Sequence, residues 1–251
     1  MLPPEIVDHI FSFLETDPLT LKKCIKSCPE LAKIIERYLF ANITICNTKS
    51  QPHSSSELVK LLSHSPHIAN YVRSLTIKVI RPAFFSRSIQ LDAMVVSVLQ
   101  EKLPRLEKVR LASAREKSRG VAWLDIHEAI RVAFLTFLRL PTLKEVSVWD
   151  IVHFPLSEFD GCQNITRLLL QGSPCYSESQ LQSPYPRLDF LSLGSCPPAI
   201  VPWVASRALP SLSCLIDGPD TFQQLLQVCS NTLIGLNVDL NTCCTLFFLI
   251  F

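Results

Sequence analysis

The sequence has few glycines and no loop that would cradle a phosphate group. Its six glycines are scattered along 251 residues, and none is followed by the Lys-Ser or Lys-Thr pair of a phosphate-binding loop. A Gly-x-Ser-x-Gly turn is also missing, so the nucleophile turn of the α/β-hydrolases is excluded. These absences argue against nucleotide hydrolysis and against that class of serine hydrolase.

Convergent sets of catalytic residues are equally scarce. His127-Glu128 begins a metalloprotease-like string, but Arg131 stands where the second histidine would be needed. Asp150 and Glu158 lie near a predicted strand end, as does Asp160, yet no histidine or lysine is spaced to orient them. We interpret these acids as surface residues and predict that the chain is not an enzyme, with no catalytic residue and no cofactor-binding residue or cofactor.

Metal-binding patterns are incomplete as well. Cys24 and Cys28 lie one helical turn apart, but no second pair follows at zinc spacing, and His64 and His67 have no cysteine neighbours. The ten cysteines are therefore interpreted as small apolar residues that stay reduced. No metal site is expected.

Long apolar runs are missing although 48% of the residues are hydrophobic and only 18% are charged. The longest run near the C-terminus, residues 246–251, is far shorter than the roughly 18 to 20 residues of a membrane helix. Met1 is followed by Leu2-Pro3-Pro4-Glu5, without the cationic start and apolar core of a signal peptide. We predict no membrane partner and a cytoplasmic and/or nuclear location.

The net charge of +2 is unevenly distributed. Residues 73–119 carry 11 basic and 4 acidic side chains, whereas residues 120–251 carry 6 basic and 11 acidic ones. Nucleic-acid binding by the basic stretch is one interpretation, but interleaved aromatic residues and a known reading motif are lacking. Ordinary solvated faces explain the pattern better, and no nucleic-acid partner is expected.

Three short helices are predicted in the first forty residues. Apolar residues at Ile6, Val7, Ile10, Phe11, Phe13 and Leu14 give the first helix an unusually wide apolar face. Asp17-Pro18 supplies a cap and a first-turn proline for the second helix. A capping box at Ser27-Cys28-Pro29-Glu30 is expected to start the third, which continues to Leu39. So short a segment cannot bury all of this apolar surface alone, so part of it should face a partner or the rest of the chain.

The stretch from Leu2 to Phe40 resembles an F-box, a three-helix module that binds the Skp-type adaptor of cullin ubiquitin ligases. Its Leu-Pro opening, the apolar positions of its first helix and its Asp-Pro-Leu turn match the family. The resemblance implies adaptor binding through these residues: Leu2, Pro3, Ile6, Ile10, Phe13, Leu14, Pro18 and Leu19.

Two aromatic anchors common in the family are absent. Cys28 is followed by Pro29-Glu30-Leu31 rather than by a nearby tryptophan, and Leu39-Phe40 replaces the usual Leu-Trp. Interface energy is concentrated in a few large residues, so these departures leave a ligase-independent function open.

The rest of the chain repeats one frame, with apolar residues at offsets 0, 3 and 5. The middle residues are Leu75, Val109, Val146, Leu168, Leu191, Leu215 and Leu236, although the sixth copy slips and ends on Asp217. Successive intervals are 34, 37, 22, 23, 24 and 21 residues, and the last four are typical of leucine-rich repeats. Each copy predicts a strand of one parallel sheet, with helices over residues 95–102 and 121–140 on the convex side.

We therefore predict an α/β protein with three parts. Residues 1–46 form the F-box-like module, and residues 47–67 form a linker and a short helix over 57–63. Residues 68–251 form an irregular, degenerate leucine-rich-repeat solenoid of about seven strand units. Because the apolar end from Cys243 onward lacks a polar capping unit, we expect a C-terminally incomplete array.

The predicted function is substrate recognition in a Skp-cullin-F-box ubiquitin ligase. The helices would bind the adaptor, and outward-facing residues of the array would bind an unidentified target protein. The target-binding candidates are Arg73, Lys108, Arg110, Trp149 and Gln171. The alternative is a repeat scaffold that binds proteins without entering a ligase.

Overall fold

The computed structural model describes residues 3–15, 17–46, 55–79, 103–114, 120–159, 161–171, 188–194, 201–205, 210–216, 223–227, 235–240 and 244–249. The helix predicted over residues 95–102 lies outside this part of the chain, as does most of the predicted linker, residues 47–54.

The N-terminal helices form where the sequence predicts them. They are α1 (Pro4–Ser12), α2 (Pro18–Ser27), a 3-10 turn η1 (Pro29–Leu31) and α3 (Ala32–Leu39). The Asp17 carboxylate caps α2 by accepting from the Thr20 backbone N–H at 3.1 Å and from the Thr20 hydroxyl at 2.6 Å. The predicted cap is therefore confirmed.

The predicted capping box at the start of the third helix is wrong. Ser27 belongs to α2, and its hydroxyl donates back to the Lys23 carbonyl at 3.0 Å. Glu30 accepts instead from the Cys28 thiol at 3.1 Å. Because the 3-10 turn η1 follows Cys28, α3 begins only at Ala32, with Leu31 as a cap that makes no side-chain hydrogen bond.

The body of the protein is a mostly parallel sheet. Among the described residues, eight parallel strands lie side by side in chain order, and a ninth is antiparallel at one edge. The strands are β1 (Asn42–Cys46), β2 (Ser74–Val79), β3 (Lys108–Ser113), β5 (Glu145–Trp149), β7 (Arg167–Gln171), β8 (Phe190–Leu193), β9 (Ser211–Ile216), β10 (Gly235–Leu240) and the antiparallel β11 (Cys244–Leu249).

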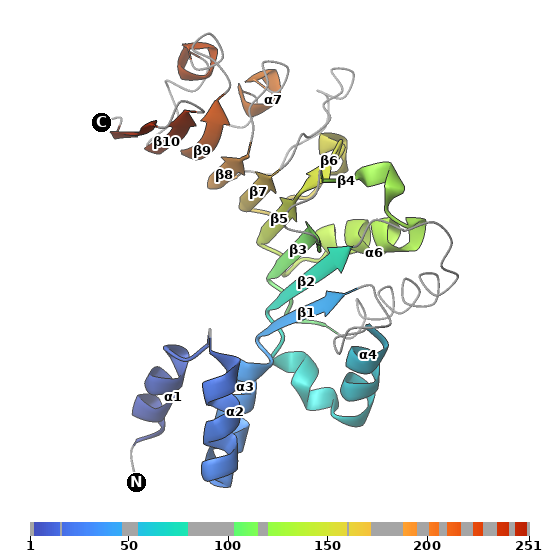
Figure 1. The fold of residues 1–251 in the computed structure, drawn as a ribbon, viewed down its shortest axis with the longest axis vertical. Helices are drawn as coiled ribbons and strands as arrows, with labels where there is room; N and C mark the ends of the chain where they lie inside the picture. Colours follow the sequence, from blue (N-terminus) through green and yellow to red (C-terminus); the bar gives the residue numbers. More distant parts are fainter. Residues whose placement is uncertain are drawn as a thin grey trace.

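The connections carry the remaining described elements. The helices are α4 (Ser55–His64), α6 (Glu128–Leu138), α7 (Val201–Ala205) and a segment at residues 223–227, with 3-10 turns η2 (Pro66–Asn70), η3 (Trp123–Asp125) and η4 (Leu156–Phe159). The short strands β4 (Val121–Ala122) and β6 (Ile151–Val152) form a small separate sheet. Figure 1 shows α4 and α6 along one side of the row of strands, while α1–α3 are grouped beside its first strand.

Register explains why the repeated apolar frame produces one core. The middle residues of consecutive copies are direct neighbours: Leu75 pairs with Val109, Val109 with Val146, and Val146 with Leu168. These side chains are at most 1% exposed. They form one cluster with buried residues of α4 and α6, such as Leu62 and Phe134. Alternation along each strand therefore sends every second side chain to the opposite face.

Two features of the frame differ from the prediction. The sheet begins with β1, before the predicted start at residue 68, because Phe40, Ile43 and Ile45 already follow the 0, 3, 5 spacing. In the sixth copy, Leu212 rather than Leu215 occupies the middle position, since it pairs with Leu191 and is 1% exposed. The prediction of Leu215 as the middle residue therefore placed the sixth copy three residues too far toward the C-terminus.

The predicted helix over residues 121–140 is shorter than expected. Its first part forms β4 and η3, and α6 starts after His127. The His127 ring accepts a hydrogen bond from the Ala129 backbone N–H at 3.2 Å and thereby caps α6. Conversely, the short helix expected at 57–63 extends to Ser55–His64.

Candidate functional site

Helix α1 carries two apolar stripes, one packed against the other helices and one exposed to solvent. Val7 and Phe11 pack into a small cluster with α2 and α3, as does Leu14 just after the helix. Ile6 and Ile10 are 48% and 45% exposed, and Phe13 is 73% exposed. Both sets have offsets of 0, 4 and 7, so each set lies along one side of the helix. One stripe holds the helices together, and the other remains open to solvent.

The predicted adaptor-binding residues divide along the same line. Ile6, Ile10, Phe13 and Leu19 are exposed, Leu19 by 70%. Pro3 and Pro18, which precede and begin helices, are also exposed, whereas Leu14 is partly buried in the small cluster. Leu2 lies outside the described residues. In the described part of the chain, six large hydrophobic residues are exposed, and these four account for most of them. We call Ile6, Ile10, Phe13 and Leu19 the helical apolar surface.

The second surface is the sheet face opposite the leucine core. Register aligns its residues in rows that cross the strands, and one row runs through Lys108, Glu145, Arg167 and Phe190. The next row runs through Thr76, Arg110, Ser147, Leu169 and Ser192, and a third through Lys78, Ala112, Trp149 and Gln171. We call these rows the strand face.

Ion pairs and cation–π contacts connect the strand face laterally. The Glu145 carboxylate lies 3.5 Å from Lys108 Nζ and 3.3 Å from Arg167 Nε. The Arg167 guanidinium lies 4.9 Å from the centre of the Phe190 ring. The Arg110 guanidinium lies 4.1 Å from the centre of the Trp149 ring. Strands β3, β5, β7 and β8 thus share one polar network.

The structure brings four of the five predicted target-binding residues together. Lys108 and Arg110 are on β3, Trp149 is on β5, and Gln171 pairs with Trp149 on β7. Trp149 is half-buried under Arg110, so it is neither a fully exposed anchor nor a core residue.

Arg73 is separate from the other four, since it precedes β2 and its guanidinium lies 3.4 Å from the Glu107 carboxylate. Sequence reasoning also omitted several residues of the strand face: Lys78, Glu145, Arg167 and Phe190. Each of them directly precedes or follows an apolar residue of the repeated frame, and this position could have identified them.

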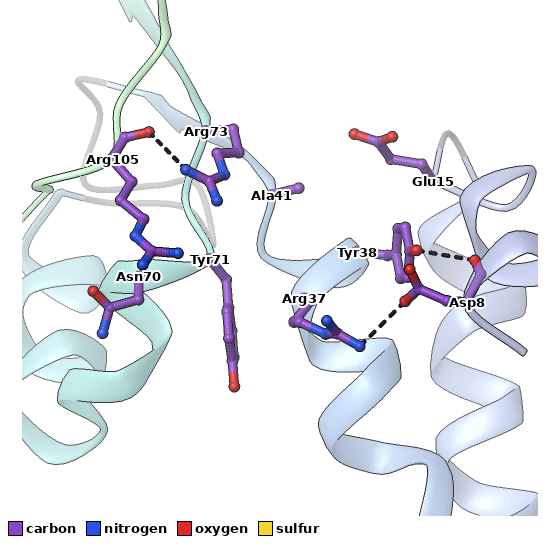
Figure 2. Close-up of a pocket in the computed structure, with 9 residues that line it drawn as sticks. All are labelled: Asp8, Glu15, Arg37, Tyr38, Ala41, Asn70, Tyr71, Arg73 and Arg105. Atoms are coloured by element: carbon purple, nitrogen blue, oxygen red, sulfur yellow. Dashed lines mark hydrogen bonds and ion pairs between the residues drawn. The ribbon is translucent and has the colours of Figure 1, made fainter. Parts of the chain in front are cut away.

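An open pocket of about 360 Å³ lies where the helices meet the sheet. Figure 2 shows Asp8, Glu15, Arg37 and Tyr38 on one side, facing Tyr71 and the arginines Arg73 and Arg105 on the other. Arg37 pairs with Asp8 at 3.1 Å, and the Tyr38 hydroxyl donates to the Asp8 carbonyl at 2.9 Å. Burial, followed by hydrogen bonding with the Asp8 side chain, raises the Tyr38 pKa above its usual value. Charges of both signs line this pocket, so it is not specific for an anion or a cation.

Two of the three acids considered as catalytic candidates, Asp150 and Glu158, lie in turns. The Asp150 backbone N–H donates to the Gln171 carbonyl at 2.7 Å, and its φ of 55° makes the left-handed turn between β5 and β6. Glu158 lies in η4, and Asp160 is outside the described residues. Within the described part of the chain, no three His, Cys, Asp or Glu side chains converge as metal ligands would. No helix of that part has the length and apolarity needed to cross a bilayer.

Comparison with known proteins gives no relative on which to base a function. No protein-family model matches this chain, and neither curated proteins nor solved structures give a significant match.

Proposed function

We propose that this chain is the substrate-recognition adaptor of a Skp-cullin-F-box ubiquitin ligase. The helical apolar surface would bind the Skp-type adaptor, and the strand face would bind the target protein. The observation that carries this proposal is the outward stripe of α1, where Ile6, Ile10 and Phe13 are each 45% or more exposed. Such a stripe on a helix whose inward stripe is already packed is typical of a binding surface.

The size of the surface suits a protein partner. Fully burying one large apolar side chain contributes about 1.5 to 3 kcal/mol. Binding energy at interfaces is concentrated in a few such residues. Ile6, Ile10, Phe13 and Leu19 would therefore supply the core of an adaptor interface, and each truncation should weaken binding about tenfold or more.

The test is co-expression of the full chain with a Skp-type adaptor, followed by co-purification. We expect the parent chain to retain the adaptor and the triple variant Ile6→Asp, Ile10→Asp, Phe13→Asp to lose it. Because these side chains are exposed, the variant should keep the parent circular-dichroism spectrum. The matched control changes two exposed apolar residues elsewhere, Leu124→Asp and Val132→Asp, which are 77% and 53% exposed. Equal adaptor recovery with parent and triple variant would exclude the proposal.

A ligase-independent scaffold is the second candidate, and one observation favours it. Phe40 stands where the family usually has tryptophan, but its side chain packs against the large cluster of the sheet. It would therefore contribute little to an adaptor interface. A soluble parent chain that retains no adaptor but still binds protein partners would support the scaffold.

A further inference from the structure

We propose that the strand face binds an acidic, extended segment of its protein partner through Arg110, Arg167 and Lys108. This inference specifies the partner of the surface assigned above to target binding, and in that respect it rests on the proposed function. It does not require a ligase, because a scaffold would use the same face.

Charge is the first argument. The three rows carry four cationic side chains on described strands: Lys78, Lys108, Arg110 and Arg167. Glu145 is the one carboxylate of those rows between β2 and β8, and it lies between two of the cations. From β2 to β8 the strand face therefore carries a net charge of +3, although the whole chain has only +2. A compact positive face on a nearly neutral protein attracts and orients a negatively charged partner.

Second, most of the positive charge on the strand face is not neutralised by its own carboxylate. Glu145 is shared by Lys108 and Arg167, whose side chains remain 54% and 52% exposed, whereas its own side chain is only 18% exposed. Arg110 has no carboxylate within ion-pair distance among the described residues, and its contact is with the Trp149 ring. One partly buried acid thus leaves most of the positive charge available to an incoming carboxylate.

Preorganisation is the third argument. The Arg110 guanidinium lies over the Trp149 ring, and the Arg167 guanidinium lies over the Phe190 ring. A guanidinium that lies over a ring keeps N–H donors at its edge for a carboxylate; on Arg110 this edge has no acid within ion-pair distance among the described residues, and on Arg167 the Nε already faces Glu145 while the terminal N–H groups remain. Side chains that are already held lose less conformational entropy on binding. The two arginines are therefore prepared for anionic ligands.

Spacing favours an extended polypeptide. Arg110 and Arg167 lie on β3 and β7, which are separated only by β5, and they are two residues apart in register, so their Cα atoms are about 12 Å apart. Side chains on one side of an extended peptide repeat about every 7 Å, and long Arg and Glu side chains cover the difference. Between the two arginines this row carries Ser147 on β5 and Leu169 on β7, so no charged side chain of the row lies between them.

The same contacts argue against nucleic acid. A single-stranded nucleic acid needs aromatic rings free to stack on bases. On this face the Trp149 and Phe190 rings already contact guanidinium groups. Their use by bases would require those contacts to break.

The experiment measures binding of a fluorescein-labelled twelve-residue peptide, (Gly-Glu)₆, to the full chain by fluorescence anisotropy at low salt. The lysine peptide (Gly-Lys)₆ and a single-stranded DNA twelve-mer are the comparison probes. We expect binding of the glutamate peptide, weakening as salt rises, and no binding of the lysine peptide. Arg110→Gln and Arg167→Gln should each weaken it about threefold to tenfold. The control is Arg139→Gln, an exposed arginine at the end of α6.

Glu145→Gln provides a gain of affinity that an unfolded variant could not imitate. Removing this carboxylate frees Lys108 and Arg167, so we expect binding about twofold to threefold tighter than that of the parent. Failure of the parent to bind the glutamate peptide, equal affinities for all variants, or tighter binding of the DNA would each overturn the proposal. The triple variant of α1 should retain full peptide binding, so a negative adaptor result and a negative peptide result are distinguishable.

Discussion

At the scale of single residues, the clearest sequence signals are those that act locally. Asp17 caps α2 as predicted, because an acceptor one residue before a first-turn proline has only local donors to satisfy. Ser27 and Glu30 have the right spacing for a cap, but Pro29 leads the chain into the 3-10 turn η1. That this segment forms a 3-10 turn rather than a capping box could not be predicted from residue types alone.

The Asp17 cap should make the stability of the helices depend on pH. Hydrogen bonds from the Thr20 hydroxyl and backbone lower the Asp17 pKa below its usual 3.8. A lowered carboxyl pKa stabilises the folded state above the unfolded-state pKa, and this stabilisation is lost as the pH falls through the folded-state pKa. We expect Asp17→Asn to flatten that part of the acid-induced loss of helix, measured by circular dichroism from about pH 6 to pH 2. Identical acid profiles for parent and variant would contradict the assignment.

At the scale of elements, helix α6 is held by aromatic packing. Phe134 is fully buried and meets Trp123 and Phe154 edge to face, with ring centres 6.4 and 6.1 Å apart. The Trp123 and Phe154 rings are themselves 4.8 Å apart. These three rings join α6, η3 and the segment after β6 into one layer over the sheet.

Replacing the central ring should therefore be costly. We expect Phe134→Ala to lower the free energy of unfolding by about 3 to 5 kcal/mol, since it removes a ring and leaves a cavity. Val132→Ala, on the exposed side of the same helix, should change it by about 0.5 kcal/mol or less. Urea titrations of the three proteins would give these differences, and similar losses for both variants would show that the ring cluster does not hold α6.

Strand positions were predictable where the apolar frame was unambiguous. Leu75, Val109 and Val146 lie in register as their spacing predicts, because burial on one face of a parallel sheet requires it. The sixth copy offered both Leu212 and Leu215, and only pairing with Leu191 identifies the residue in the core. The small sheet of β4 and β6 was missed because two-residue strands carry no periodicity.

The candidate surfaces were partly predictable for a similar reason. The apolar face of the first helix is too wide to be buried entirely against its neighbouring helices, so exposure of part of it could be predicted from the sequence. Which part is exposed, here Ile6, Ile10 and Phe13, could be determined only from the fold. The network of Glu145 with Lys108 and Arg167 depends on three strands that are distant in sequence. Lateral neighbours of this kind appear only when the register is known.

At the scale of the whole molecule, the described residues contain two separate hydrophobic clusters. Phe11, Leu21 and Ile35 form the buried part of the small one, and the large one runs through the sheet. The Asn42 side-chain amide donates to the Glu15 carboxylate at 2.8 Å, so the link between the two parts includes an exposed hydrogen bond. Exposed polar contacts couple two units weakly.

The two parts should therefore unfold separately. We expect Leu21→Ala, which truncates a fully buried side chain, to increase amide exchange in α1–α3 while β2, β3 and β5 remain protected. Leu168→Ala, at a position 1% exposed, should have the opposite pattern. Hydrogen exchange followed by mass spectrometry distinguishes the segments, and parallel loss of protection in both parts would contradict the separation.

Pairing of parallel strands in chain order also bears on how the protein is made. From β1 to β10 each parallel strand adds beside the one that precedes it in the sheet, so no early strand waits for a partner from the far end of the chain (Figure 1). A growing chain can dock each new strand onto the finished edge soon after it leaves the ribosome. The strands would then fold in the order in which they are translated. At each stage, the unpaired edge on the growing side of the sheet would be the strand added last.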